Sequence, residues 1–456
     1  MFLGLIVAHL LRFFSTFVGK HKQTIMRQKI LLLLTVALCA VTASAGVKDD
    51  FKRDIRQSAG NYWAYPDKDL PKLTVTPDGY TPFFINHYGR HGSRWLIGNH
   101  LYNFPVEQLE KGERNGKLTK RGREVLAILR ELRASAQGRD GELSDIGAEQ
   151  HQGIARRMYA NFPEVFAGDA PVRARSTIVI RCILSMQNEV DVLKSLNPEL
   201  RITTDASQAE MYYMNYDDPV VKPLREGAYK HFDPMKAKLI KPEKFLARLF
   251  SDKKFARDSI KGEDLMIDLF DVVGNMQSHH QWEKTDLYDL YTLDEATNVW
   301  RYNNLRWYVF SGETPLTQCR VDFIEANLLR SFIEDADQAI LEGRNQASLR
   351  FGHESVVLPL VCLMGINGAD YQTTDLETLD RYWQSYKIFP MACNLQMIYF
   401  KPVDGNGDIL VKVLLNEHEA TLPVKTDMAP YYRWNDVRDY YMDKLSRQPF
   451  IPSVIE

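Results

Sequence analysis

The chain has 456 residues, of which 45% are hydrophobic and 25% charged, so it can fold as an ordinary globular protein with a large core and two or three domain-sized units. Its formal net charge of −2 at pH 7 argues against a dedicated nucleic-acid-binding protein, which would usually be clearly basic. Its five cysteines are sparse and have no CxxC spacing, which argues against both a zinc site and a disulfide-built scaffold.

The N-terminal residues 1–45 are predicted to lie outside the fold. From Met26 the sequence reads MRQKILLLLTVALCAVTASAG, with a basic start, an apolar run and small residues before Gly46. This order is typical of a secretory signal peptide. We therefore expect the mature chain to begin near Gly46 and to be exported, as a periplasmic or secreted protein.

Other interpretations of this segment fit less well. A transmembrane anchor needs about 20 apolar residues and the run here is shorter, so no stable membrane span is expected in the mature chain. A lipoprotein anchor at Cys39 is disfavoured because Leu38, rather than glycine or alanine, precedes it. Residues 1–25, themselves apolar and basic, are interpreted as sequence upstream of the true start.

The first predicted strand covers Thr81–Tyr88, an apolar stretch (TPFFINHY) that leads directly into GRHG. Polar residues that follow a buried strand in an open α/β sheet lie at the edge where ligands bind. The sequence LSDIGAEQHQGIARRMYANF predicts a helix capped by Ser144. A short strand at 172–177 (VRARST) and a helix at 178–196 follow, with Arg181 in the first turns of that helix.

Residues 206–317 differ in character, because they are rich in aromatics and lysines, show helical periodicity and contain few candidate strands. A long helix over 321–341 then restores the alternating pattern, and a strand at 348–352 leads to His353-Glu354. A buried helix (VVLPLVCLMG) and a hairpin around DGNGD follow. The predicted fold is therefore an α/β sandwich whose core, residues 46–205 and 318–456, is interrupted by a helical cap at 206–317.

The stretch HYGRHGSRW (87–95) concentrates positive charge and leaves little side-chain bulk. Neighbouring cations repel each other and glycines cost backbone entropy, so such a stretch is favoured where an anion binds. One alternative is that Arg90 and Arg94 pair with carboxylates and that His91 is an ordinary histidine. Another is a metal site that uses His87 and His91 as an i, i+4 ligand pair. This needs a helix, whereas the flanking residues predict a strand and a glycine loop.

Two further strand ends supply residues of the same kind. Arg181 follows the strand at 172–177, and His353 and Glu354 follow the strand at 348–352. With RHGSR, this makes the set of arginines, histidines and one carboxylate that phosphoryl transfer requires. Guanidinium groups bind phosphate oxygens bidentately, and neighbouring cations keep a histidine neutral and nucleophilic. A carboxylic acid protonates the leaving oxygen and then activates water.

These residues resemble the motifs of the histidine phosphatase superfamily, specifically of its acid phosphatase and phytase branch. That branch has RHGxR followed far downstream by HD or HAE, and here RHGSR (90–94) is followed by HE (353–354). RSTIVIRC resembles the RSTxxxRT segment of the branch, and LSDIG resembles its LTxxG helix start. FGHESVVLPLVCLMG, FPMACNLQMIYF and VLLNE are most similar to the multiple inositol polyphosphate phosphatases.

The resemblance spans the chain from about Pro82 to Val424 and implies a fold, a reaction and site residues. The implied fold is a three-layer α/β sandwich with an inserted helical domain. The implied reaction is hydrolysis of phosphomonoesters without a metal or any other cofactor. His91 would be the phosphorylated nucleophile and Glu354 the general acid. The phosphoryl group would be held by Arg90, Arg94, Arg181 and His353.

The sequence departs from the family pattern at two places. Trp95-Leu96 stands where the family usually has proline two residues after the second arginine, which predicts an altered loop with the chemistry intact. Glu354 follows His353 directly, as the aspartate does in the HD motif, and Ser355 takes the place of the HAE glutamate. Glu354 is one methylene longer than that aspartate and can still reach the leaving oxygen, but the serine puts specialisation for phytate in doubt.

The segment between Lys222 and Lys261 gives a clue to the substrate, because twelve lysines and arginines stand there against five acids. If part of this segment faces the site, it would attract a polyanion such as phytate toward His91. The alternative is a solvated helix surface. The run MYYMNY (211–216) is interpreted either as a wall of the site or as core packing.

The leading hypothesis is an exported histidine phosphatase that hydrolyses small phosphomonoesters, with inositol polyphosphates such as phytate as favoured substrates and no nucleic-acid partner. The runner-up is a broad-specificity acid phosphatase that acts on sugar phosphates or nucleotides. A hypothesis from another class is an inactive protein that retains the phosphate site as an anion receptor. Against it, every group that turnover requires is present in the sequence.

Overall fold

The structure is a computed structural model in which residues 46–68 and 70–447 are described. The predicted signal peptide at 1–45 lies outside these residues. Contacts divide the chain into two units, Met1–Asp50 and Phe51–Glu456, and the division falls inside helix α3 (Val47–Arg53). All features described below belong to the second unit.

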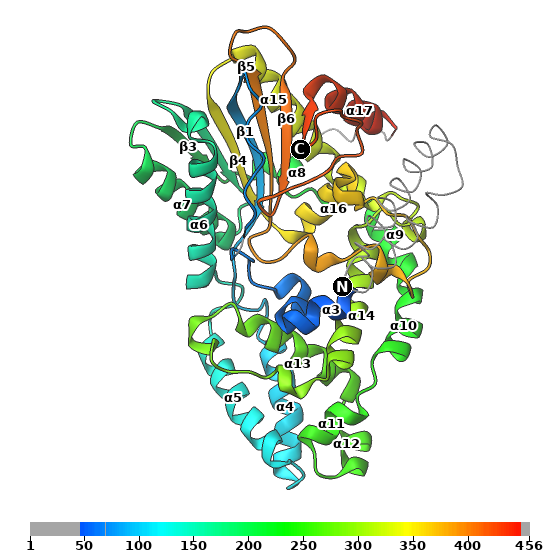
Figure 1. The fold of residues 1–456 in the computed structure, drawn as a ribbon. Helices are drawn as coiled ribbons and strands as arrows, with labels where there is room; N and C mark the ends of the chain where they lie inside the picture. The colour runs from blue at the N-terminus through cyan, green and yellow to red at the C-terminus, as the bar shows by residue number, and fades with distance from the viewer. Residues whose placement is uncertain (1–45, 69, 448–456) are drawn as a thin grey trace, which may run out of the picture. The chain divides into compact units, whose positions relative to one another are not determined.

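A mixed sheet with the strand order β3-β2-β4-β1-β5-β6-β7 lies at the centre of this unit, and β8 also pairs with β6 (Figure 1). The pairs among β1, β2, β3 and β4 are parallel, whereas β5 to β8 join by antiparallel pairing. The strands are β1 (Tyr80–Arg90), β2 (Pro171–Ser176), β3 (Arg201–Asp205), β4 (Gln346–Gly352), β5 (Asn394–Pro402), β6 (Leu410–Leu415), β7 (His418–Glu419) and β8 (Tyr431–Arg433).

The register of the parallel strands aligns their carboxyl ends. Strand β1 lies between β4 and β5, and it pairs Arg90 with Gly352, the last residue of β4. Strand β4 pairs Phe351 with Ser176, the last residue of β2. The segments that follow β1, β2 and β4 therefore start next to one another at one edge of the sheet, where ligands bind in folds of this class.

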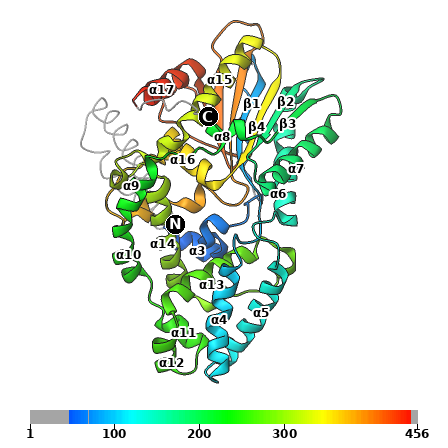
Figure 2. The same ribbon diagram turned by 180° about the vertical axis from the view of Figure 1, so that it is seen from behind.

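Helices cover both faces of the sheet, as Figures 1 and 2 show. On one face, Ile85 of β1 joins the apolar core formed with α6 and α7. On the other face, Phe84 and Tyr88 join the core formed with α15 and α16, as strand alternation requires. The predicted three-layer α/β sandwich is confirmed. The covering helices are α6 (Asp145–Asn161), α7 (Ile180–Leu196), α15 (Ala326–Glu342), α16 (Glu354–Met364) and, packed on α15, α17 (Trp434–Ser446).

Most of the predicted elements are present with small shifts of their ends. The Ser144 hydroxyl caps α6 and accepts a hydrogen bond from Gly147 N at 3.2 Å. The helix predicted over 321–341 instead begins as a 3-10 helix, Val321–Glu325, and becomes α-helical from Ala326. The apolar run after His353 forms α16, which is buried from Val356 onward, and β5 and β6 form the predicted hairpin.

Residues 206–317, all of which the structure describes, are helical and contribute no strand to the sheet. Helices α4 (His100–Arg114) and α5 (Lys120–Ala136), which the sequence assigned to the core, pack against α13 and α11. The helical part of the molecule therefore also includes residues 100–136. Its remaining helices are α8 (Met211–Met214), α9 (Val221–Ala228), α10 (Phe232–Leu239), α11 (Glu243–Leu249), α12 (Lys253–Ser259), α13 (Gly262–Met276) and α14 (Leu293–Ser311).

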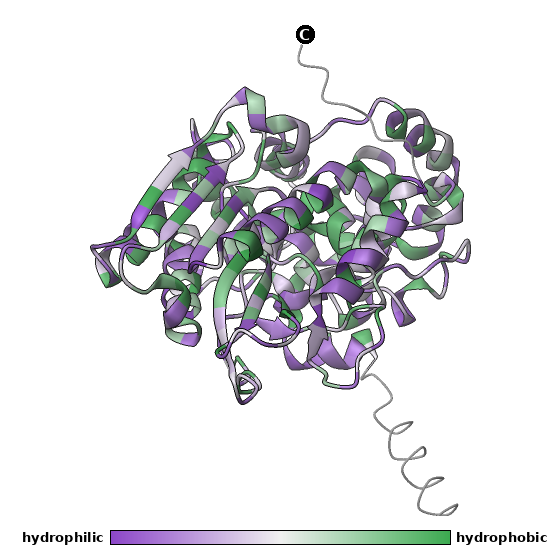
Figure 3. Ribbon diagram, turned by 90° about the horizontal axis from the view of Figure 1, so that it is seen from above, coloured by the Kyte–Doolittle hydropathy of each residue, from purple (hydrophilic) through white to green (hydrophobic). Residues whose placement is uncertain are grey.

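The surface helices are amphipathic. Figure 3 shows hydrophilic and hydrophobic residues alternating along most of them, as expected for helices that pack one face inward. Within residues 46–68 and 70–447, no helix combines the length and the apolar character needed to cross a membrane. The four cysteines of the same ranges, Cys182, Cys319, Cys362 and Cys393, are unpaired.

Candidate active site

Strand β1 brings His91 to the site, and both neighbouring strands hold the backbone there. Arg90 N donates a hydrogen bond to Cys393 O at 2.8 Å, and His91 N donates one to Gly352 O at 2.9 Å. Ala392 N donates to His91 O at 3.1 Å. The side chain of His91 therefore starts from a fixed backbone, which a correctly oriented catalytic group needs.

Gly92 brings the loop after β1 against helix α6. A Cβ atom at this position would lie 2.3 Å from Gly147 O and 2.6 Å from Gly147 Cα, so only glycine fits. Ser185 Oγ accepts a hydrogen bond from Gly92 N at 3.1 Å, and Gln150 Oε1 accepts one from Ser93 N at 2.9 Å. Sequence reasoning missed Gln150 and Ser185, because a polar residue within a helix carries no local sign of the backbone that it will contact.

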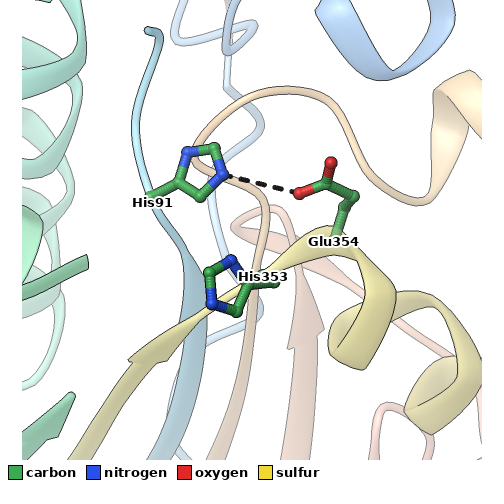
Figure 4. A group of neighbouring side chains, drawn as sticks. All are labelled: His91, His353 and Glu354. Carbon is green, nitrogen blue, oxygen red and sulfur yellow. Dashed lines mark ion pairs between the residues drawn. The ribbon is translucent and has the colours of Figure 1, made fainter. Parts of the chain in front are cut away.

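The imidazole of His91 is buried and directs Nε2 toward Glu354 (Figure 4). Its Nδ1 lies 2.9 Å from Gly92 O, which only accepts, so we assign the proton to Nδ1 and the lone pair to Nε2. Nε2 has no hydrogen-bond partner among the described residues and lies 3.5 Å from Glu354 Oε2. Burial lowers the pKa of His91 well below 6.5, with Arg90 and Arg94 acting in the same direction and Glu354 opposing them. His91 is therefore a neutral imidazole with a free lone pair, the form that acts as a nucleophile.

Arg90 is fully buried and is held by backbone carbonyls. Its Nη1 donates to Asn61 O at 2.7 Å and to Phe389 O at 3.1 Å. Its Nε lies 3.1 Å from Glu354 Oε2, and its Nη2 has no hydrogen-bond partner in the described chain. Two carbonyls thus fix one side of the guanidinium, and the other side is available to an anion.

Arg94 and Arg181 add two more guanidinium groups. Arg94 Nη1 donates to Trp95 O at 2.9 Å, and Nη2 lies 4.0 Å from Glu354 Oε1. Arg181 stands in the first turn of α7. Burial lowers the pKa of Arg181, and the nearby Arg94 acts in the same direction whereas Glu354 opposes it. Arg94 Nε and Arg181 Nε are buried and have no hydrogen-bond partner in the part of the chain that the structure describes.

His353 and Glu354 mark the junction of β4 and α16. His353 is the N-cap residue of α16, and its Nε2 lies 3.2 Å from Thr177 Oγ1. Its ring centroid is 5.8 Å from that of His91. Burial, together with Arg181 and other cations, lowers the pKa of His353 to about 4, although Glu354 opposes this. The five residues Arg90, His91, Arg94, Arg181 and His353 are called the anion site below.

Glu354 lies beside the anion site and is the single carboxylate among the six residues predicted from the sequence. Burial alone would raise the pKa of Glu354, but Arg90, His91 and Arg94 outweigh burial and hold it well below 4.5. The structure thus brings together all six residues that the sequence predicted for the site. Their roles in binding and catalysis stay predictions.

A metal ion is the alternative ligand for these side chains. One ligand atom from each of His91, His353 and Glu354 lies within 4.8 Å of the others, which is a spacing that a cation could use. Arg90 and Arg94 lie against the same carboxylate and would repel a cation. The charge of the site therefore favours an anion.

The His87 and His91 ligand pair is not formed. His87 lies within strand β1, so the two residues are not on one face of a helix, and its ring packs 5.3 Å from that of Phe351. Burial, with His151 and Arg350, lowers the pKa of His87 to about 3. No group of potential metal ligands in the described chain includes it.

Five of the twelve basic residues in segment 222–261 form ion pairs with nearby acids. Figures 1 and 2 both place α11 and α12 at the end of the helical part that is far from the sheet. These two helices therefore lie away from the site, and for the rest of the segment the expectation that part of it faces the site stays a prediction. The ion pairs are Lys236–Asp264 at 2.7 Å, Lys238–Glu377 at 2.5 Å, Arg248–Glu295 at 2.9 Å, Lys254–Asp258 at 2.7 Å and Arg257–Asp258 at 2.8 Å.

The run MYYMNY is partly core. Tyr213 and Met214 are buried, and Tyr88 of the central strand donates a hydrogen bond from its hydroxyl to Met214 O at 2.8 Å. Of the two interpretations of this run, core packing is the one that these contacts support.

No family model matches the chain. The multiple inositol polyphosphate phosphatase 1 of Gallus gallus is 22% identical to it over 327 residues, which cover 68% of this chain and 70% of the relative.

Solved structures share the fold. The multiple inositol polyphosphate phosphatase of Bifidobacterium longum, in its apo form, matches with a TM-score of 0.67 at 17% identity, covering 85% of this chain and 97% of that one. The same protein in complex with inositol hexasulfate gives a TM-score of 0.65 at 17% identity over the same shares of the two chains. The phytase of D. castellii gives 0.61 at 16% identity, covering 86% of this chain and 85% of that one. The chain therefore has the fold of the acid phosphatase and phytase branch of the histidine phosphatases, and the resemblance predicted from its motifs is confirmed.

Proposed function

We propose that the chain is a phosphomonoesterase that transfers a phosphoryl group from its substrate to His91 Nε2 and then to water. One observation carries the proposal. Buried nitrogens without hydrogen-bond partners among the described residues, on Arg90, Arg94 and Arg181, accompany the free Nε2 of His91 beside a carboxylate. Buried donors that lack partners are costly, and a phosphoryl group would satisfy them.

The reaction follows in two steps. In the first, His91 Nε2 forms a bond to phosphorus, the bond from phosphorus to the ester oxygen breaks, and Glu354 transfers a proton to that oxygen. In the second, a water oxygen attacks phosphorus, the phosphorus–nitrogen bond breaks, and Glu354 takes up a proton from the water. Inorganic phosphate leaves, and His91 and Glu354 return to their starting states. The arginines stabilise the negative charge on the transferred group.

Glu354 must carry a proton when the ester bond breaks, although its pKa in the free site is low. The cations that lower its pKa, Arg90 and Arg94, are the groups proposed to bind phosphate. A bound phosphate adds negative charge beside the carboxyl group and therefore raises its pKa. A phosphate monoanion can also bring the proton, and its second pKa is about 6. Activity should therefore be highest in acid and fall as the pH rises above about 6.

Inositol polyphosphates such as phytate are the proposed substrates. The curated relative is named an inositol polyphosphate phosphatase, and the Bifidobacterium longum protein forms a complex with inositol hexasulfate. A broad acid phosphatase is the second candidate. It is favoured by Glu354, which directly follows His353 as the acid does in HD motifs, and by the ion pairs that neutralise part of the basic segment.

Export is also proposed, on the sequence of residues 26–46 alone, which has the order of a signal peptide. An inactive anion receptor remains the alternative of another class. Its weakness is that the residues proposed for turnover, His91, the arginines and Glu354, lie close to one another.

Phosphate release by the chain from Gly46 onward tests the proposed reaction and substrate. Phytate and an aryl phosphate are compared from acid to neutral pH in the presence of a chelator, with His91→Ala as the control. Release from phytate that the substitution abolishes supports both the mechanism and the substrate. Release from the aryl ester alone moves the function to a general acid phosphatase. Phosphate binding without turnover of either ester would favour the anion receptor.

A further inference from the structure

A side chain of the helical part, Asn275, fixes the loop that carries Arg94. Asn275 lies in the last turn of α13 and is 2% exposed. Its Nδ2 donates a hydrogen bond to Arg94 O at 2.8 Å, and its Oδ1 accepts one from the Tyr102 hydroxyl at 3.3 Å. The same hydroxyl oxygen accepts a hydrogen bond from Leu96 N at 3.0 Å. One buried amide thus reaches the loop at two points, directly and through a tyrosine of α4.

These contacts hold two consecutive peptide planes. In the plane between Arg94 and Trp95, the carbonyl accepts from the asparagine amide and Trp95 N donates to Glu142 O at 3.0 Å. In the next plane, Leu96 N donates to the tyrosine hydroxyl, and Trp95 O accepts from Nη1 of Arg94 itself at 2.9 Å. Because a peptide unit is rigid and planar, rotation of either plane would move the carbonyl that orients the guanidinium of Arg94.

Trp95 adds a packing contact with the same helical segment. Its ring lies 4.0 Å from the His279 ring, and the guanidinium carbon of Arg139 lies 5.0 Å from the indole. Burial and Arg139 lower the pKa of His279 to about 4, so the imidazole packs in its neutral form. Its Nε2 lies 3.4 Å from Asn275 Oδ1. This loop, which lacks the proline usual in related sequences, is therefore held by hydrogen bonds and ring packing from the helical part.

We infer that Asn275 is a positioning residue that holds Arg94 in the orientation needed to bind the transferred phosphoryl group. The inference rests on the proposed function, because that proposal assigns Arg94 to the phosphate. It extends that function by giving the helical part a role in phosphate binding itself.

Substitution of Asn275 by leucine removes both the donor and the acceptor, keeps a side chain of similar length and adds no charge. Asn304 provides a matched control. It is 1% exposed on α14, its Nδ2 donates to Trp383 O at 3.0 Å, and its Oδ1 accepts from Ser385 N at 2.8 Å. Asn304→Leu thus also removes both hydrogen-bonding groups of a buried amide without touching the Arg94 loop. Tyr102→Phe is a milder second variant, since it removes only the hydroxyl and keeps the buried ring.

The measured quantities are the inhibition constant of inorganic phosphate, KM and kcat for an aryl phosphate, and Tm. One buried hydrogen bond is worth up to about a factor of ten, so we expect Asn275→Leu to raise the inhibition constant about ten-fold and Tyr102→Phe about three-fold. KM should rise more than kcat falls. Asn304→Leu should lower Tm and leave the inhibition constant within about two-fold of wild type, because its contacts do not reach the site.

Two results would overturn the inference: a lower Tm with an unchanged inhibition constant in Asn275→Leu, or an equal rise in Asn304→Leu. If Asn275→Leu does not fold, Tyr102→Phe decides by the same criterion. Failure of the proposed function gives a different result, because the wild-type chain would then neither bind inorganic phosphate nor release it from an ester. That result would also contradict the inference. A wild-type chain that does both, with variants whose inhibition constant for phosphate is unchanged, would contradict the inference alone.

Discussion

Replacing Glu354 by glutamine removes the proposed acid and its negative charge while keeping the shape of the side chain. Turnover of phytate should fall by about 10²–10⁴-fold, because an alkoxide needs a proton as it leaves. With an aryl phosphate, the rate of the first step should fall much less, since a phenolate leaves without that proton. Hydrolysis of the phosphohistidine would then be slow, so one phenol per chain should be released in a burst before a slower steady state.

The same substitution should tighten the binding of inorganic phosphate. Glu354 Oε2 lies 3.1 Å from Arg90 Nε, and Oε1 lies 4.0 Å from Arg94 Nη2, so a phosphate on these nitrogens would meet the carboxylate. Two like charges 4 Å apart repel by about 4 kcal/mol at an effective dielectric constant of about 20. In the wild-type chain, protonation of the Glu354 carboxyl group relieves part of this repulsion. We therefore expect Glu354→Gln to tighten the binding of inorganic phosphate at pH 7 about ten-fold.

The assay measures kcat for both esters and the inhibition constant of inorganic phosphate at pH 5 and pH 7. Glu377→Gln is the control, since Glu377 pairs with Lys238 on the surface of the helical part. Equal losses on phytate and the aryl ester, with phosphate binding unchanged, would show that Glu354 is neither the acid nor a neighbour of the bound phosphate.

Two further predictions concern stability. Gly92→Ala would place a Cβ atom 2.3 Å from Gly147 O. It should lower the free energy of unfolding, measured with urea, by about 1–3 kcal/mol, and it should also lower activity. Gly227→Ala, which meets nothing within 4 Å, should not destabilise, and equal effects of the two would refute the close-contact explanation. Burial and Glu313 raise the pKa of Asp322 from 3.8 to about 7, so the folded protein favours the protonated carboxyl group. The free energy of unfolding is therefore highest, as far as this group is concerned, below pH 3.8, and it falls as the pH rises to about 7. The difference amounts to about 4 kcal/mol, and Asp322→Asn should therefore raise Tm at pH 8 but not near pH 4; the same change at both pH values would contradict this.

The strand ends could be predicted from the sequence because their signals are local. RHGSR and HE each follow an apolar run, and the parallel register of β1 and β4 then brings them together. Arg181 follows β2 by the same rule. Each of these positions depends on a short segment and on one general property of α/β sheets.

The side chains that hold the loop could not be predicted in this way. Gln150 bonds a residue 57 positions away, Ser185 one 93 positions away, and Asn275 one 181 positions away. Helical periodicity shows which face of a helix is apolar but not which segment a buried polar residue will contact. Only the packing of α6, α7 and α13 reveals these partners.

The charge that the basic segment presents could be predicted only in part, for a similar reason. Counting charges along the chain ignored partners that the fold supplies from outside the segment, such as Glu295 for Arg248 and Glu377 for Lys238. The same limit applies to α4 and α5, whose helical character is local but whose packing against α13 and α11 is not. Elements could be predicted from local patterns, whereas their neighbours depend on the tertiary fold.

The most direct test of the proposed mechanism is to identify the phosphorylated residue during turnover. The chain from Gly46 onward is mixed with an aryl phosphate, quenched at alkaline pH within milliseconds, digested and analysed by mass spectrometry. The mechanism predicts an acid-labile phosphate on the peptide that contains His91, more of it in Glu354→Gln and none in His91→Ala. Phosphate on another residue, or turnover with no phosphorylated chain at any quench time, would contradict it.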